Sequence, residues 1–85
     1  QVIPNVPEVI SISAEVKEEL GIEGWSVEKA EGKLGARIAM IDRQDFDGTR
    51  SVLDPSNVET ILLGDRLYIL LLKEHLKKLE KSLGS

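Results

Sequence analysis

The feature that most constrains the fold is an apolar run near the C-terminus, 67–72, followed at once by an amphipathic segment, 73–83. A short, continuous apolar run of this kind is typical of a strand that is buried on both faces. The amphipathic segment has leucines at helical spacing, Leu76, Leu79 and Leu83, so we expect it to form a helix. A strand that is apolar on both faces needs neighbouring strands and a covering layer, which the rest of the chain must supply.

The upstream chain predicts three further strands and one further helix. Alternating apolar residues predict a half-buried strand over 9–16. Apolar residues on both faces predict an inner strand over 36–43, and a short strand follows over 50–53. Between the first two strands, Ser26 is a suitable N-cap for a helix over 27–34.

Two local expectations are specific enough to check. The helix is expected to end at Gly35, because glycine adopts the left-handed conformation that commonly closes a helix. In the inner strand, simple alternation places Ile38 and Met40 on one face, and Ala39 and Ile41 on the other.

The predicted order of strand, helix, strand, strand, strand, helix indicates an α+β domain with a small mixed or antiparallel sheet and both helices on one face. The domain covers 9–85, and 1–8, which contains two prolines, is expected to be the end of a linker. The last strand is apolar on both sides, although helices cover only one side. We therefore expect a homodimer, with Tyr68, Leu70 and Leu72 in its interface or in the core.

Composition narrows the class of function. The 85 residues carry a net charge of −4 and no cysteine. An acidic chain lacks the basic surface that nucleic-acid binding needs, and no apolar run approaches the length of about 20 residues of a membrane span. Without cysteine there is neither a disulfide nor a thiolate metal site. We expect a cytoplasmic domain that binds no nucleic acid and does not insert into a membrane. Because the chain begins with Gln1 rather than Met, we also expect it to be a piece of a longer protein.

No sequence pattern predicts catalysis, and we expect that the chain is not an enzyme. The single histidine, His75, has no nucleophile or orienting partner near it in the sequence, so a surface helical histidine is the favoured interpretation. Asp45 and Asp47, just before Gly48, partly match the start of a calcium-binding EF-hand loop. An ordinary acidic hairpin loop is favoured here, and a weak divalent-cation site at the two aspartates is the alternative.

Several stretches together carry a family resemblance: Gly24-Trp25-Ser26-Val27, Gly35-Ala36-Arg37-Ile38-Ala39-Met40-Ile41-Asp42-Arg43, Asp54-Pro55 and Gly64-Asp65-Arg66-Leu67. With the apolar strand and leucine-rich helix that follow, they resemble the TrkA-C domain, the C-terminal half of the regulator-of-K⁺-conductance (RCK) module. The resemblance covers nearly the whole chain after Val9, and the expected order of strands and helices is the order of that family.

The resemblance implies a regulatory role on the cytoplasmic side of a potassium channel, a potassium-uptake system or a cation antiporter. Such domains dimerise and usually follow a Rossmann-like nucleotide-binding half. In some members the dimer cleft binds a small effector, of which cyclic di-AMP is the best known, so a cyclic dinucleotide or another nucleotide is the implied effector. The matching positions here are Ile41, Arg43, Asp54 and Pro55, with Asp54 in place of the asparagine of those members. The alternative is a purely structural assembly domain of the same transport system, with no ligand of its own.

Overall fold

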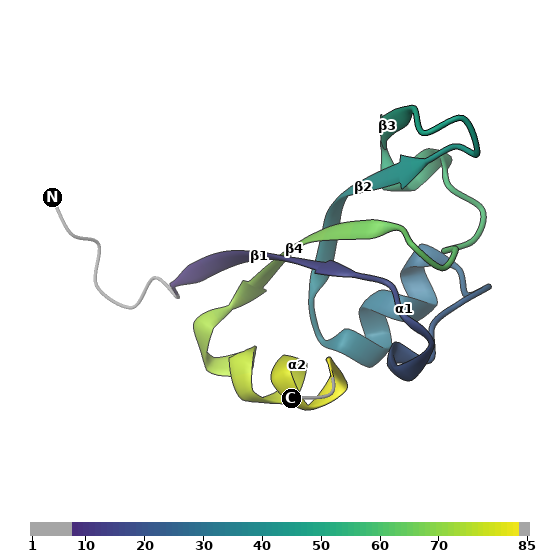
Figure 1. Ribbon diagram of the computed structural model, residues 1–85. Coiled ribbons are helices and arrows are strands. Elements are labelled where there is room, and N and C mark those ends of the chain that lie inside the picture. The colour runs from purple at the N-terminus through teal and green to yellow at the C-terminus, as the bar shows by residue number, and fades with distance from the viewer. Residues whose placement is uncertain (1–7, 84–85) are drawn as a thin grey trace, which may run out of the picture.

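The structure is a computed structural model that describes residues 8–83 (Figure 1). It has an open four-stranded antiparallel sheet and two helices, which confirms the small α+β fold class. The strands are β1 (Val9–Glu15), β2 (Arg37–Gln44), β3 (Arg50–Leu53) and β4 (Arg66–Leu72), in the order β1-β4-β2-β3 across the sheet. The helices are α1 (Val27–Leu34) and α2 (Leu76–Ser82). Of the expected linker 1–8, all but Glu8 lies outside the described residues.

The sheet has a face that the helices cover and an open face, and only the covered side of β4 is fully buried. The register between β1 and β4 runs unbroken from Val9 opposite Leu72 to Glu15 opposite Arg66. The β4 residues on the helical side are at most 4% exposed: Leu67, Ile69 and Leu71. The residues between them are half-buried or exposed, and Leu70 reaches 40% exposure. One set of apolar side chains on β4 therefore packs in the core, and the other set lies on the open face of the sheet.

Helix α1 begins and ends where its capping residues predict. The Ser26 hydroxyl oxygen accepts a hydrogen bond from the Lys29 N–H over 3.2 Å, which satisfies one of the unpaired donors of the first turn. Gly35 has a φ of +66°, and its N–H donates to the Glu31 carbonyl oxygen over 2.9 Å. Ala30 and Leu34 are buried against the sheet, so packing supplies most of the stability of this short helix.

The alternation expected within the inner strand is wrong because β2 contains a bulge. Ile38 pairs with Ile69 and Met40 pairs with Tyr68, so Ala39 is an extra residue in the ladder. The extra residue reverses the alternation, and Ile38 and Ile41 both point into the core, whereas Ala39 and Met40 are both exposed. The bulge thus supplies a second inward isoleucine and leaves Met40 on the open face.

The C-terminal helix begins three residues later than expected. Residues Lys73–His75 form a 3₁₀ turn, and the α-helical segment α2 begins at Leu76. The Lys73 N–H donates to the Glu8 carbonyl oxygen over 2.9 Å, so this residue still belongs to the sheet ladder. The buried position of α2 is Leu79, which is 0% exposed, and Leu76 and Leu83 pack at the border of the core.

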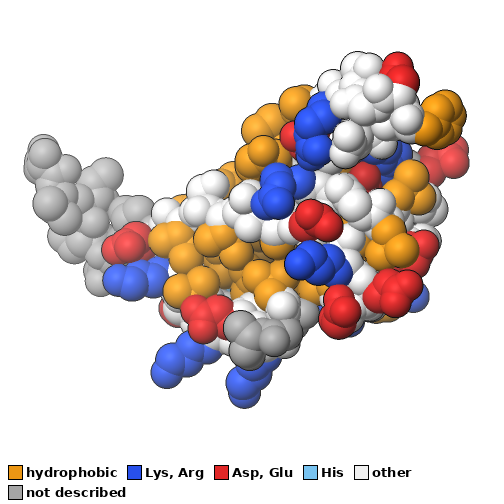
Figure 2. Space-filling view, in the orientation of Figure 1, with side chains coloured by type: hydrophobic (Ala, Val, Ile, Leu, Met, Phe, Trp, Pro, Cys, Tyr) orange, Lys and Arg blue, Asp and Glu red, His pale blue; other side chains and the backbone are white. Residues whose placement is uncertain are grey.

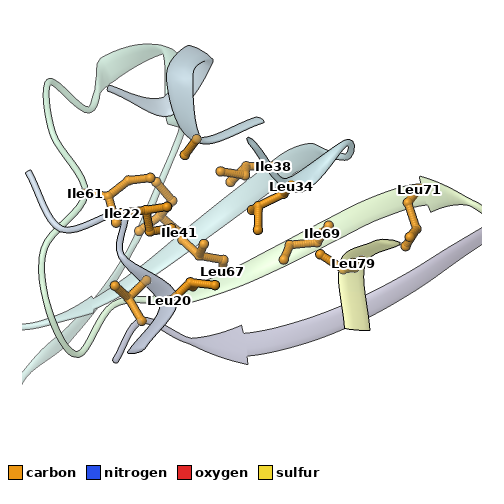
Figure 3. Packing of buried hydrophobic residues seen from close by; sticks show 12 residues of the cluster. Leu20, Ile22, Leu34, Ile38, Ile41, Ile61, Leu67, Ile69, Leu71 and Leu79 are labelled. Carbon is orange, nitrogen blue, oxygen red and sulfur yellow. The ribbon is translucent and has the colours of Figure 1, made fainter. Parts of the chain in front are cut away.

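One hydrophobic core lies between the sheet and the two helices (Figure 3). Its members come from both helices, from strands β2 and β4, and from the segments that connect the helices and strands: Val16, Leu20, Ile22, Ala30, Leu34, Ile38, Ile41, Ile61, Leu67, Ile69, Leu71 and Leu79. Ile22 and Ile61 are both 0% exposed although both lie in loops. The loops on this side are therefore packed parts of the fold.

Candidate functional site

The four positions implied for a ligand do not form one cleft within the chain. Ile41 is 0% exposed and pairs with Leu53 of β3 on one side and Leu67 of β4 on the other. Its side chain belongs to the hydrophobic core and offers no surface to a ligand. In the single chain Ile41 is therefore a core residue, and the role that the resemblance implies for it in a dimer cleft stays a prediction.

Arg43 is held by a buried carboxylate. Its Nε donates to Oδ1 of Asp65 over 2.9 Å, and its Nη2 donates to Oδ2 over 2.8 Å. The Asp65 side chain is 1% exposed, and the Arg43 side chain retains 25% exposure. Paired, charge-assisted bonds of this kind are directional as well as strong. Arg43 thereby links the end of β2 to the start of β4.

The same ion pair organises the loop that precedes β4. Nη2 of Arg43 also donates to the carbonyl oxygen of Thr60 over 3.0 Å, and the Leu62 N–H donates to Oδ2 of Asp65 over 2.9 Å. The Val16 N–H donates to the carbonyl oxygen of Asp65 over 2.7 Å. A buried carboxylate is tolerated when hydrogen bonds and an opposite charge surround it. We therefore describe Arg43 and Asp65 as a structural clip.

Arg43 remains charged in this clip. The hydrogen bond to Asp65 raises the pKa of Arg43 above its ordinary value, and the negative charges of Asp65 and Asp45 act in the same direction against the opposing effect of burial. A guanidinium is charged at physiological pH even without such neighbours. A phosphate that bound Arg43 would compete with the buried Asp65 carboxylate for the same donors.

Asp54 and Pro55 do border a pocket. It has a volume of about 670 Å³ and lies between the start of α1, the first half of β2 and the 3₁₀ turn η2 (Pro55–Asn57). Besides Asp54 and Pro55, its wall includes Ser26, Val27, Ala39 and Leu70. Two of the four implied ligand positions therefore lie in a concave surface, and Arg43 and Ile41 do not line it.

The charged groups of this pocket are predominantly acidic. Glu28, Glu31 and Asp54 line it together with one cation, Arg37. Oε2 of Glu31 accepts a hydrogen bond from the Ile38 N–H over 2.8 Å, which holds α1 against β2. Like charges across a binding surface oppose association, so these carboxylates disfavour a phosphate ligand.

Asp54 has a clear local role as the cap of η2. Its Oδ1 accepts hydrogen bonds from the N–H of Ser56 over 2.9 Å and from the Ser56 hydroxyl over 2.8 Å. The backbone bond is the main reason that the pKa of Asp54 lies below its ordinary value, and the hydroxyl bond adds to it. Pro55 occupies the first position of the turn, where its fixed φ is favourable.

The acidic loop between β2 and β3 is a hairpin connection. Oδ1 of Asp47 accepts a hydrogen bond from the Thr49 N–H over 2.9 Å, and this bond lowers the pKa of Asp47. The Asp45 N–H donates to the Thr49 carbonyl oxygen over 2.8 Å, and Gly48 has a φ of +88°. Within residues 8–83, no three Asp, Glu or His side chains lie close enough together to hold a metal ion.

The open face of the sheet is divided into an apolar half and a charged half. Pairing across β1, β4 and β2 places five apolar side chains on one half of it, and we call them the apolar half-face: Val9, Met40, Tyr68, Leu70 and Leu72. Ser11 of β1 and Arg37 of β2 pair with Leu70 and flank it on this face. Val9, Met40 and Leu70 are 59%, 43% and 40% exposed. The other half holds ion pairs, among them Arg50 with Asp42 at 3.1 Å. Leu70 belongs to the apolar half-face and also borders the Asp54–Pro55 pocket.

Sequence reasoning included Gly64-Asp65 in the family resemblance but missed the burial of Asp65. Its partner, Arg43, lies 22 residues upstream, and nothing local joins the two. The available signal was an aspartate directly before the most apolar strand, a position where an unpaired charge would be costly. The α1 side of the pocket was also missed, because its residues meet η2 only in the folded chain.

Comparisons with protein-family models, with curated proteins and with solved structures gave no match. In the part of the chain that the structure describes, no helix has the length and apolar character needed to cross a membrane.

Proposed function

We propose that this chain is a dimerising regulatory domain of a cation channel or transporter, of the TrkA-C kind. In this role it assembles subunits on the cytoplasmic side of a potassium channel, a potassium-uptake system or a cation antiporter. The proposal draws on the family resemblance of the sequence and on the strand and helix order, which agrees with what that resemblance implies.

The observation that carries the proposal is the apolar half-face. Helices cover one side of the sheet, yet Val9, Met40 and Leu70 expose large apolar side chains on the other side. A contiguous apolar surface with a charged border is characteristic of a protein interface. A second copy related by a two-fold axis would cover it with the same surface.

Assembly is better supported than nucleotide sensing. Of the residues implied for a nucleotide effector, Ile41 is buried in the core and Arg43 is bound to Asp65. The pocket at Asp54 and Pro55 is lined by more carboxylates than cations. An effector that carries phosphates would therefore meet repulsion where the resemblance implies attraction.

A transport measurement in the host cell tests the proposal. Leu70→Asp places a charge in the centre of the apolar half-face, where its burial in an interface is costly. We expect rubidium uptake, which reports on potassium transport, to change in cells that carry this variant. The matched control is Val52→Asp, since Val52 is 66% exposed and lies opposite Asp42 in the charged half. Unchanged uptake in cells whose Leu70→Asp protein is folded and monomeric would contradict the proposal.

Effector sensing is the second candidate, favoured by the position of Asp54 and Pro55 in the pocket. Asp54→Asn removes one carboxylate, keeps an oxygen that can cap η2, and introduces the residue of the cyclic di-AMP-binding members. We expect this variant to bind cyclic di-AMP more tightly than the natural chain, measured as thermal stabilisation. A ligand at a hundredfold excess over its Kd stabilises the folded state by about 2.7 kcal/mol. Equal and negligible shifts for both chains would leave assembly as the function.

A further inference from the structure

Strand β1 forms a long, regular edge of the sheet (Figure 1). It has seven residues, and within the described chain it pairs only with β4. The opposite edge strand, β3, has four residues, and one of them, Arg50, is tied to Asp42 by an ion pair. Short edges and edge charges are common protections against pairing with another chain. Only β3 has both.

The hydrogen bonds at the two ends of β1 show which of its backbone groups are free. The Val16 N–H donates to the Asp65 carbonyl oxygen, and the Glu8 carbonyl oxygen accepts from the Lys73 N–H. Hydrogen bonding alternates along an antiparallel strand, so the even-numbered residues bond to β4. The N–H and C=O groups of the odd-numbered residues therefore point away from the sheet: Val9, Ser11, Ser13 and Glu15.

Nothing in the sequence of β1 blocks pairing along this edge. The strand reads Val-Ile-Ser-Ile-Ser-Ala-Glu, with no proline or lysine, and its register with β4 has no bulge. The only charge is Glu15 at its end, which lies 3.9 Å from Arg66. A regular edge strand with these properties is a template for a further strand.

The core is also incompletely covered along β1. Ile10, Ile12 and Ala14 point to the helical side but are only half-buried, as are Leu76 and Leu83 of the C-terminal segment. Figure 2 shows hydrophobic side chains gathered at the surface along β1 and between β1 and α2. A strand added to this edge would cover the open side of these residues.

We propose that β1 pairs with β1 of a second copy of this chain, antiparallel, about a two-fold axis at Ile12. In this register Ser11 lies opposite Ser13 of the second copy, and Val9 lies opposite its Glu15. Every outward N–H then faces an outward C=O, because odd-numbered residues meet odd-numbered residues. The two Ile12 side chains meet on the helical side. The half-buried residues along β1 of one copy, Ile10, Ile12 and Ala14, then lie beside those of the other copy.

The charges at the ends of β1 permit this arrangement. Glu15 has Arg66 as its own cation, and Glu8 has Lys73 at 3.8 Å. Strand β1 itself carries no lysine or arginine, and the cation beside its middle is Arg66, whose Nη1 donates to the Ser13 hydroxyl oxygen over 3.3 Å. A second copy is the occupant that this register fits, since one strand sequence complements itself on both faces. The edge shares only Val9 with the apolar half-face, so the inference goes beyond the proposed function.

Two separate isologous surfaces on one domain allow assembly beyond a dimer. Main-chain hydrogen bonds and one isoleucine contact must offset the entropy lost on association, so we place this step at higher concentration than the dimer of the apolar half-face. Edge pairing would then join those dimers.

Cysteine cross-linking tests the register. The chain has no cysteine, so Ile12→Cys introduces a single thiol. In the proposed register the two residues form a non-hydrogen-bonded pair with Cα atoms about 4.5 Å apart, within the range that a disulfide spans. The control is Ile10→Cys, whose two copies would be offset by about 14 Å along the strands. We expect mild oxidation to give a covalent dimer about tenfold faster for Ile12→Cys. Equal rates in two folded variants would overturn the proposal.

A proline at the edge gives an independent check. Ser13→Pro removes an N–H that points away from β4 and has no partner strand among the described residues, and proline is tolerated at such edge positions. We expect it to abolish association beyond the dimer at high concentration, whereas Ser13→Thr keeps it. Cross-linking of Ile12→Cys that persists with Leu70→Asp supports an edge interface independent of the apolar half-face. Association of Ser13→Pro beyond the dimer, equal to that of Ser13→Thr, would overturn the proposal.

Discussion

Asp65 joins three parts of the fold through the hydrogen bonds of its side chain and its carbonyl oxygen. Its carboxylate binds Arg43 at two points and accepts the Leu62 N–H, and its carbonyl oxygen accepts the Val16 N–H. One aspartate therefore connects the end of β1, the end of β2 and the loop before β4. Such a group is stabilising only while all its partners remain, because burial of an uncompensated charge is costly.

We predict that Asp65→Asn destabilises the domain by about 3 kcal/mol, at the low end for broken buried ion pairs because Arg43 keeps part of its side chain in water. Urea unfolding followed by circular dichroism measures the change. The control is Glu15→Gln, which removes an exposed pair with Arg66 at 3.9 Å and is expected to cost at most about 1 kcal/mol. Equal effects of the two variants would show that the clip is not structural.

Asp54 provides a test of pH dependence. Its folded pKa is depressed below the ordinary value of 3.8, first by the Ser56 N–H and then by the Ser56 hydroxyl. A depressed carboxyl pKa contributes stability at pH values above the unfolded pKa, and that stability is lost as the pH falls through the folded pKa. We therefore expect the cap of η2 to be intact at neutral pH and to open only below pH 3.8.

An NMR titration of the Asp54 carboxyl carbon measures this pKa. Ser56→Ala removes the hydroxyl donor and keeps the backbone donor, so the midpoint should rise without reaching the value of an unfolded chain. A midpoint in the natural chain at or above the unfolded value would show that the cap does not form in solution.

At the scale of elements, the two glycines of α1 predict changes of opposite sign. Gly35 ends the helix with a φ of +66°, a conformation that costs a residue with a Cβ about 1–2 kcal/mol. Gly32 lies within the helix, and a Cβ there would contact nothing within 4 Å. We expect Gly35→Ala to destabilise the domain by about 1 kcal/mol and Gly32→Ala to stabilise it by about 0.5–1 kcal/mol. Thermal unfolding of the two variants gives both signs, and a shared sign would contradict the assignment of the helix end.

The elements that sequence reasoning predicted well are those defined by local signals. Ser26, Gly35 and the alternation of β1 act within a few residues, so their positions are confirmed. The bulge at Ala39 was missed because it depends on how β2 meets β4, and the late start of α2 because Lys73 is retained by Glu8. Contacts between residues that are far apart in the sequence determine both the bulge and the start of α2.

In the candidate site, too, local features could be predicted from the sequence, and features that depend on packing between distant residues could not. The turn at Asp54 and Pro55 could be read from the sequence, whereas the other walls of its pocket come from α1, β2 and β4 and meet η2 only in the folded chain. The pairing of Arg43 with Asp65 and the burial of Ile41 depend on the packing of β2 between β3 and β4. A resemblance can align such residues with ligand contacts, but it does not determine whether the fold already uses their side chains.

At the scale of the whole molecule, the domain has a small core and leaves apolar surface open. The helices cover one side of the sheet, and Val9, Met40 and Leu70 remain exposed on the other. A chain of this size buries only about 60–65% of the surface of its unfolded form, so burial against another subunit is a substantial gain. The self-assembly that we propose would cover Val9, Met40 and Leu70.

Sedimentation velocity of the natural chain and of Leu70→Asp tests this claim most directly, at about 10 micromolar, where dimers of micromolar Kd are largely formed. We predict a dimer for the natural chain, a dimer for the control Val52→Asp, and a folded monomer for Leu70→Asp. A monomeric natural chain would contradict self-assembly through the apolar half-face, and so would a Leu70→Asp variant that sediments as the natural dimer does.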